Sequence, residues 1–169
     1  MKIVVAMDSL KGSLTSIEAG EAIRKGILNV DASANVVVKP LADGGEGTTE
    51  ALVSGMGGVL CTQRVTGPIG LAVEATYGIL PDQNMAVIEM AQAAGLPSVP
   101  KEKRNPLYTT TYGVGEMIKA CIEKGCRKFI VGIGGSATND AGIGMLKALG
   151  YRFLDSKGQD VGEGGQVLE

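Results

Sequence analysis

The first sixty residues alternate between short β-branched runs and helical patterns, and this alternation constrains the fold more than any other feature of the chain. Residues 2–6 and 35–39 are strand-like runs rich in valine and isoleucine. Between them, Thr15 and Glu18 have the spacing of a helix capping box, and apolar residues then recur at helical intervals up to Val30. Residues 48–54 predict a second helix. This order is typical of a parallel sheet with crossover helices, and we predict a Rossmann-like or flavodoxin-like α/β unit over residues 1–65.

The middle of the chain changes character. Three strand-like runs, at 60–65, 72–80 and 85–89, are separated by turns that leave no room for helices, which indicates hairpins. The later pattern predicts a helix with Val114, Ile118, Cys121 and Ile122 on one face and Gly125 after its end, a strand over 128–131, a helix over 140–149 and a strand over 151–154. We therefore predict a second α/β unit with a mixed sheet over residues 66–169.

The last residues begin a further glycine-rich segment, at 161–169, that leads into no complete unit. A natural α/β domain seldom stops within a unit, so we expect the chain to be part of a longer protein and the second unit to be incomplete. Apolar faces meant for the missing part would then be exposed and would favour self-association.

Composition excludes several classes of function. The chain of 169 residues has a net charge of −2 with no basic stripe, which argues against nucleic acid and membrane-surface partners. Its three cysteines have no CxxC spacing, so neither a disulfide framework nor a zinc site is expected, and the cytoplasm is the expected location. Histidine is absent, so acid–base chemistry would fall to carboxylates, lysines or the substrate.

A first loop, residues 8–13, follows the first predicted strand with the sequence DSLKGS. Ligands of open parallel sheets bind beyond the carboxyl ends of the strands, which is where this loop should lie. Asp8 offers a carboxylate and Lys11 a positive charge for a phosphate or a carboxylate. Ser9, Gly12 and Ser13 are candidate substrate-binding residues. An ordinary capping loop, with Lys11 in solvent, is the alternative.

A second loop, residues 43–49, follows the second predicted strand with the sequence DGGEGTT. Asp43 and Glu46 flank the candidate substrate-binding pair Gly44 and Gly45. Carboxylates beside backbone amides suit Mg²⁺ carried by a nucleotide, and Asp43 could instead orient a substrate hydroxyl. The alternative is a plain turn, with Glu46 merely favourable near a helix N-terminus.

A third loop, residues 132–140, has the sequence GIGGSATND between a predicted strand and a predicted helix. Glycines allow the backbone to approach phosphate oxygens, and hydroxyl groups can donate to them. A tight turn alone would explain one or two glycines and not the polar residues. The Walker A pattern is absent from the chain, so any ATP site lies outside the P-loop scheme. The candidate nucleotide-binding residues are Gly134, Gly135, Ser136, Ala137, Thr138 and Asn139.

Two other classes of function remain open at this point. Gly132, Gly134 and Ala137 fit a loose dinucleotide fingerprint, and Asp155 follows about twenty residues later at the end of a predicted strand. A nicotinamide-dependent oxidoreductase is therefore one alternative, although it leaves the first two loops unexplained. A non-catalytic module that binds a small anion is the other.

Taken together, the motifs resemble the bacterial-type glycerate kinase family. The segments that match, in the family's order, are DSLKGSL at 8–14, ADGGEGT at 42–48, VTGPIG at 65–70, IEMA at 88–91, RNPL at 104–107 and GIGGSATND at 132–140. Met7 and Leu10 depart from the residues common in relatives, and Ala141 stands where glycine is common, which would be tolerable inside a helix.

This resemblance implies an ATP- and Mg²⁺-dependent kinase that phosphorylates D-glycerate, with 2-phosphoglycerate as the expected product. It implies a chain about twice as long, so we expect this part alone to be inactive. We assign the third loop to the ATP phosphates, Lys11 to a phosphate or the glycerate carboxylate, Asp43 or Asp8 to the attacking hydroxyl, and Glu46 or Asp140 to the metal. Glu89, Arg104 and Asn105 lie in matching segments, and we expect them to hold an interface.

Overall fold

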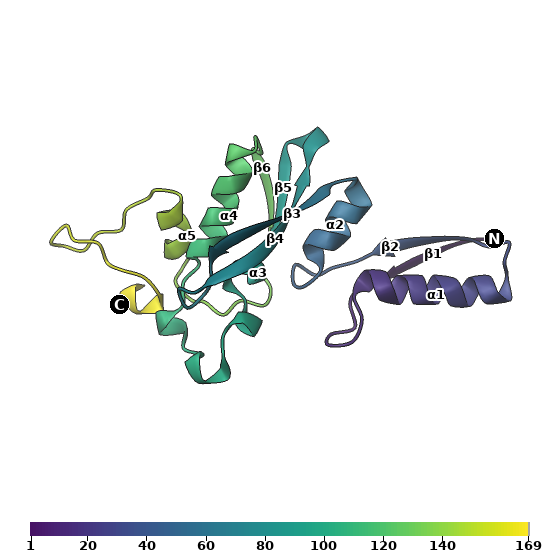
Figure 1. Cartoon of the computed structure of the whole chain (residues 1–169), viewed down its shortest axis with the longest axis horizontal. Helices are drawn as coiled ribbons and strands as arrows, with labels where there is room; N and C mark the ends of the chain where they lie inside the picture. The colour runs from purple at the N-terminus through teal and green to yellow at the C-terminus, as the bar shows by residue number, and fades with distance from the viewer. Residues whose placement is uncertain (169) are drawn as a thin grey trace.

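The computed structural model describes residues 1–168 and contains two separate sheets (Figure 1). A two-stranded parallel sheet with one helix, residues 2–40, extends to one side, and we call it the N-terminal arm. The remaining residues from 48 onward form the main body around a four-stranded sheet. The second loop connects the two parts, so it lies at their junction.

The N-terminal arm consists of β1 (Lys2–Met7), α1 (Ser16–Val30) and β2 (Asn35–Pro40). The two strands pair in parallel, with Lys2 opposite Asn35 and Met7 opposite Pro40. Thr15 caps α1 as predicted: its hydroxyl accepts the Glu18 amide, and the Glu18 carboxylate accepts the Thr15 amide. The strand–helix–strand prediction is therefore confirmed.

The main body begins with α2 (Thr48–Met56) and continues through β3 (Val59–Thr66), β4 (Ala72–Leu80), β5 (Met85–Glu89) and β6 (Lys128–Gly132). The strand order is β3-β4-β5-β6, with antiparallel pairs up to β5 and a parallel pair between β5 and β6. This is the mixed sheet that the hairpins and the later strand predicted. The chain changes sheet between β2 and β3, whereas the division into units at 65/66 stays a prediction.

Three further helices complete the body: α3 (Ala91–Ala94), α4 (Tyr112–Glu123) and α5 (Ile143–Ala148). Short 3₁₀ turns occupy Pro81–Gln83, Leu96–Ser98, Lys101–Lys103, Pro106–Tyr108 and Gly165–Leu168. Helix α4 packs on the sheet, and the core between them includes Tyr77, Ile88 and Met117, each at most 1% exposed. No helix within residues 1–168 has the length and apolar character needed to cross a membrane.

Two predictions near the end of the chain are wrong. The last helix begins at Ile143 and not at residue 140, because Ala141 (φ 50°) and Gly142 (φ 76°) turn the backbone into the left-handed region. Ala141 therefore lies outside the helix, whereas the prediction of a helix over 140–149 places it inside. Residues 151–154 form no strand: only Leu154 makes an isolated bridge, with Asp160, because a turn at Asp155 folds the chain back on itself.

Candidate functional site

The first loop follows β1 and is held by its own backbone. The Asp8 carboxylate accepts the Ser9 amide at 2.6 Å, and the amides of Ser13 and Leu14 both bond to the Leu10 carbonyl. Gly12 has φ 74°, which allows this tight reversal. The Lys11 side chain is exposed. The loop therefore presents its charged groups on a fixed turn.

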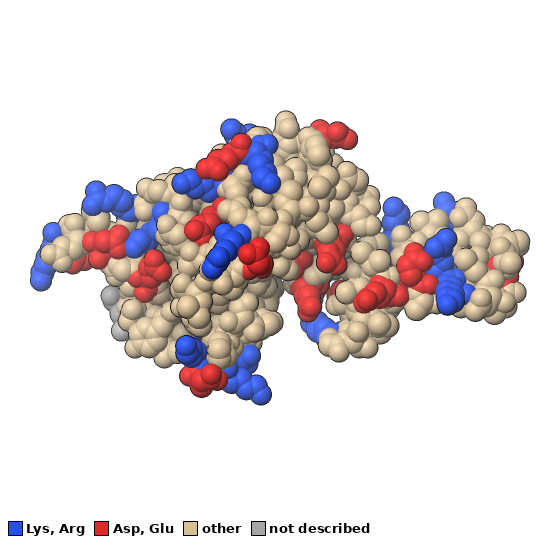
Figure 2. Space-filling view, in the orientation of Figure 1, with Lys and Arg blue, Asp and Glu red and all other residues tan. Residues whose placement is uncertain are grey.

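The second loop lies beside the first, and the two share a cavity of about 210 Å³. Ser9, Lys11 and Ser13 line it from the first loop, and Glu46 and Gly47 line it from the second. Asp43 is exposed, and its carboxylate accepts the Gly45 amide at 3.0 Å. Acidic side chains gather on the surface where the arm meets the body (Figure 2). Lys11 and Glu46 thus meet at one cavity, whereas Asp8 and Asp43 do not line it.

The second and third loops touch through their glycines. The Gly134 amide donates to the Gly44 carbonyl at 3.0 Å. A Cβ on Gly134 would lie 2.7 Å from the Gly45 Cα, and one on Gly132 would lie 2.6 Å from the Gly44 carbonyl oxygen. Two backbones approach this closely only where side chains are absent. We call this contact the glycine seam. It explains Gly132 and Gly134, whereas Gly44, Gly47 and Gly135 have positive φ angles that turn geometry explains.

The third loop is also fastened to the body on its other side. Gly135, with φ 71°, accepts the Leu96 amide, and the Ala137 amide donates to the Ala94 carbonyl. The Thr109 hydroxyl donates to the Ala137 carbonyl at 2.8 Å. Ser136 and Thr138 hydrogen-bond to each other, and Asn139 is exposed. The third loop is therefore held in place by hydrogen bonds to the body.

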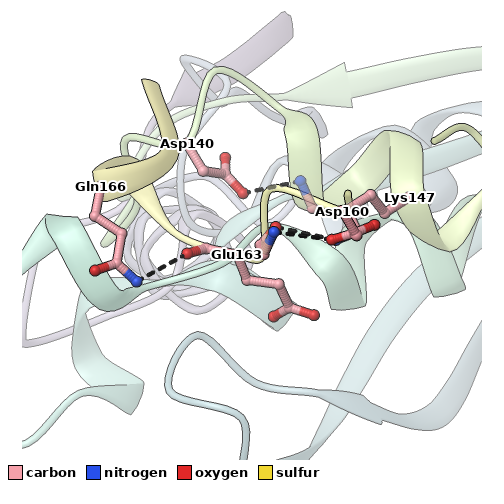
Figure 3. A network of polar contacts seen from close by, with 7 residues as sticks. Asp140, Lys147, Asp160, Glu163 and Gln166 are labelled. Carbon is pink, nitrogen blue, oxygen red and sulfur yellow. Dashed lines mark hydrogen bonds and ion pairs between the residues drawn. The ribbon is translucent and has the colours of Figure 1, made fainter. Parts of the chain in front are cut away.

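Asp140 ends the third loop and lies buried, with 1% of its surface exposed. Its carboxylate accepts the amide and the hydroxyl of Thr111 and the amides of Gly142 and Gly144, all within 3.1 Å. Figure 3 shows it beside the network in which the Lys147 ammonium contacts Asp160 and the Gly162 carbonyl. A carboxylate with four internal donors joins α4 and α5.

Each helix that follows one of the three loops has a carboxylate at its N-terminus. Glu18 bonds to the chain before α1, Glu89 accepts the Thr49 amide of α2 at 2.6 Å, and Asp140 accepts two amides at the start of α5. Negative charge is stabilised at such positions, so these helix ends are already neutralised. These helix N-termini are therefore less favourable for a phosphate than N-termini without such a carboxylate. An incoming anion must bind to loop amides, hydroxyls and cationic side chains.

Two further cavities flank the third loop. One, of about 360 Å³, has apolar walls from Met90, Val114, Ile133 and Met145 and a polar edge that includes Thr138. The other, of about 250 Å³, contains Arg104 and Asn105 facing residues 136–138 of the loop. The loop therefore separates an apolar hollow from one with a cation.

The structure brings Ser9, Lys11, Gly12 and Ser13 of the first loop, but not Asp8, to one cavity with Glu46, and it joins the second loop to the third. It does not bring Glu46 and Asp140 together, since they line different cavities. Within residues 1–168, no three acidic or cysteine side chains are grouped as metal ligands. Burial raises the pKa of the Cys121 thiol to about 12, which keeps it protonated.

Two residues hold the site together: the sequence assigned Glu89 to an interface without naming its partner, and it gave no role to Thr111. Glu89 is 3% exposed and connects the end of β5 to the start of α2. A carboxylate at the end of an otherwise apolar strand was the available signal. Thr111 bonds to Asp140 and to the Met145 amide, and its place in a run of three threonines gave little indication of that role.

The profile of the "Glycerate kinase family" matches residues 3–169. A glycerate kinase of Bacillus subtilis is 52% identical over 168 residues, which are 99% of this chain and 44% of that protein. Glycerate 2-kinase of Escherichia coli is 50% identical, with the same coverage. The crystal structure of a protein assigned as glycerate kinase 2 from Salmonella typhimurium LT2 superposes with a TM-score of 0.90 at 48% identity, covering the whole of this chain and 45% of that one. The chain spans less than half the length of the curated relatives it matches.

Proposed function

Because the chain belongs to the glycerate kinase family, we propose that it carries part of a site for phosphoryl transfer from ATP, with Mg²⁺, to D-glycerate. The name of the Escherichia coli relative, glycerate 2-kinase, supports 2-phosphoglycerate as the product. The chain corresponds to under half of these relatives, so the proposal concerns the groups found here. The three cysteines are free thiols, which supports a reducing compartment such as the cytoplasm.

The observation that carries the proposal is the continuity of the three loops. The first and second share a cavity, and the second and third share the glycine seam. Phosphoryl transfer requires an acceptor, a donor and charge neutralisation at one place, and little covalent chemistry from the protein. Three loops in contact can supply that, whereas a dinucleotide site would need a strand before Asp155, and none is present.

ATP supplies the phosphoryl group, and the residues of the chain position it. We assign the third loop, residues 134–139, to the phosphates, because the loop is rigidly held and Gly135, Ser136 and Asn139 are exposed. Lys11 is assigned to a phosphate or the glycerate carboxylate. Ser9, Gly12, Ser13, Gly44 and Gly45 would contact the substrate from the cavity side and the seam.

Acid–base and metal roles follow the exposure of the carboxylates. Asp43 is exposed and fixed by the Gly45 amide, so it suits the orientation of an attacking hydroxyl, with Asp8 as the second candidate. Glu46 lines the shared cavity and is the preferred carboxylate near Mg²⁺. For Asp140 we now favour a structural role, because its carboxylate is buried and already accepts four internal donors.

The test is ADP formation that depends on D-glycerate and Mg²⁺, measured for this chain and for Asp43→Asn. Asp82→Asn is the matched control, since Asp82 is exposed in the turn Pro81–Gln83, outside all three loops. Turnover that is lost in Asp43→Asn and kept in Asp82→Asn supports the proposal. If the chain shows no turnover, its binding of ATP and of D-glycerate is measured by calorimetry. Binding of neither ligand contradicts the proposal. Binding without turnover in a chain extended to the length of its relatives favours the non-catalytic alternative.

A further inference from the structure

The cavity between Arg104 and the third loop has the chemistry of an anion site. Its walls come from two segments far apart in sequence: Leu96, Val99 and residues 104–106 on one side, and residues 136–138 on the other. Its volume of about 250 Å³ is below the range typical of drug-sized ligands, so it suits a small acid or a phosphate group rather than a whole nucleotide.

Arg104 enters this cavity with most of its hydrogen-bonding capacity unused. Its Nε donates to the Val99 carbonyl at 3.1 Å, which fixes the plane of the guanidinium group. The two ion pairs found within residues 1–168 are Arg24–Glu21 and Lys147–Asp160, so no carboxylate there neutralises Arg104. A guanidinium group fixed by one nitrogen can present its other N–H groups as a fork to an oxyanion.

Asn105 adds neutral donors beside the guanidinium group. Its side-chain oxygen accepts the Leu107 amide at 3.1 Å, which orients the group. Over the described part of the chain, no hydrogen bond occupies its side-chain nitrogen. Arginine and asparagine thus supply oriented donors, and the one acceptor oxygen between them, that of Asn105, already accepts the Leu107 amide.

The cavities around the loops contain few cations. Lys11 lines the first cavity and Arg104 lines this one, whereas the apolar cavity has neither lysine nor arginine among its lining residues. The helix N-termini after the loops are neutralised by Glu18, Glu89 and Asp140, so they contribute little to anion binding. The proposed reaction brings a polyphosphate and a carboxylate to these loops, and two cations are available to them.

We propose that Arg104 and Asn105, facing Ser136 and Thr138, form an oxyanion subsite that takes either a phosphate of the nucleotide or the carboxylate of the hydroxy acid. This inference rests on the proposed function and assigns Arg104 a binding role in place of the interface role expected from the sequence. Phosphate and carboxylate are both matched by the guanidinium fork, and only the ligand distinguishes them.

The test follows the amide signals of Ser136, Ala137 and Thr138 by NMR while the chain is titrated with inorganic tripolyphosphate or with D-glycerate. In the wild type, at least one probe shifts these signals to saturation. Arg104→Met lowers the affinity for that probe roughly ten- to a hundredfold, which is the range for losing hydrogen bonds to a charged group. Arg104→Lys lowers this affinity less, because lysine keeps the positive charge and lacks only the forked pair of N–H donors.

Lys101→Met is the matched control, because Lys101 lies in the adjacent 3₁₀ turn and does not line the cavity. It should leave both affinities within about twofold, as expected for an exposed charge. Circular dichroism of each variant verifies that it is folded. A change confined to tripolyphosphate identifies a phosphate subsite, and a change confined to D-glycerate identifies a carboxylate subsite.

The subsite is overturned if Arg104→Met binds both probes as the wild type does, or if neither probe shifts the loop signals at millimolar concentration. Its failure is distinct from failure of the proposed function. Wild-type rates of glycerate-dependent ADP formation in Arg104→Met would remove the subsite and leave the kinase proposal standing. Arg104-dependent binding without turnover, in a chain extended to the length of its relatives, would support the subsite and contradict the kinase proposal.

Discussion

The N-terminal arm and the main body contain the same kinds of strand and helix, yet the contiguous core cluster lies entirely in the body. The core cluster draws its buried residues from β3, β4, β5, α3, α4 and Cys126, with Phe129 of β6 packed against it, and Ala75, Ile88 and Met117 are fully buried. In the arm, the predicted inner face of α1 is covered only in part: Ala19 is 3% exposed, whereas Ile23 is 42% exposed and Val30 is 92% exposed. The sheet of the arm has only two strands, and α1 lies along one side of it (Figure 1).

This difference shows that helical periodicity identifies the apolar face of a helix but does not show whether another element packs against that face. The arm repeats the pattern of a parallel α/β unit, but two strands and one helix enclose little volume. Val4, at 57% exposed, adds to its apolar surface. The self-association expected from the sequence stays a proposal, and this exposure supports it.

The largest expected effect comes from the same substitution made in both regions. Ile88→Ala removes a fully buried side chain and should lower the free energy of unfolding by about 2–5 kcal/mol. Ile23→Ala, in the arm, should cost less than about 1 kcal/mol, because that side chain is already partly in water. Urea unfolding followed by circular dichroism measures both. Equal losses would show that the arm is as well packed as the body.

The next effect tests the seam that links the two regions. Gly134→Ala would place a Cβ 2.7 Å from the Gly45 Cα, so the second and third loops must separate. We expect a loss of about 1–3 kcal/mol and shifted amide signals at Gly44 and Gly45. Gly55→Ala is the control, since its Cβ meets nothing within 4 Å and alanine favours the helix. Wild-type stability in Gly134→Ala, with unchanged signals, would refute the seam.

Local order was largely predictable from the sequence. β-Branched runs, the capping box at Thr15 and the glycine at Gly57 set the elements from β1 to β5 close to their observed bounds. Prediction failed where local chemistry competed with pattern. At Asp140 the apolar spacing of a helix is present, but the buried carboxylate takes the amides of Gly142 and Gly144 and delays the helix to Ile143.

The three loops of the site were predictable one by one, and their contacts were not. The bond from Gly134 to Gly44 joins residues ninety positions apart, and no local pattern encodes such a pairing. The same limit applies to Arg104, because the role proposed for it depends on the third loop lying on the opposite side of the cavity. A single sequence shows which residue types are available, whereas the fold decides which of them share a cavity.

A smaller effect should distinguish a helix of the arm from a helix of the body. Gly26→Ala lies in α1 with open space around the new Cβ, so it should stabilise the helix by about 0.5–1 kcal/mol. Hydrogen exchange of α1 amides should slow while that of α4 amides stays unchanged, if the arm opens independently. Gly115→Ala in α4 is the contrasting variant, because its Cβ would lie 2.2 Å from the Met145 carbonyl oxygen and should destabilise the body. Slowed exchange in both helices after Gly26→Ala would mean that the arm and the body unfold together.

The smallest effect compares two carboxylates whose pKa values are lowered by different means. In the arm, hydrogen bonds from the backbone and then the hydroxyl of Thr15 lower the pKa of Glu18. In the body, the Lys147 ammonium, followed by the Gly162 amide, lowers the pKa of Asp160. A lowered folded-state pKa means that each contribution to stability is present above the usual carboxyl pKa and is lost as the pH falls through the folded value.

Carboxyl titration by NMR, at low and at high salt, separates the two causes. Salt should raise the pKa of Asp160 towards its usual value, because the half-exposed carboxylate of this ion pair is reached by screening ions, and should leave that of Glu18 nearly unchanged. Lys147→Met should raise the pKa of Asp160 alone, and Thr15→Ala that of Glu18 alone. If salt moved both values equally, charge rather than capping geometry would hold Glu18, and the start of α1 in the arm would depend on ionic strength as the Lys147 contact does.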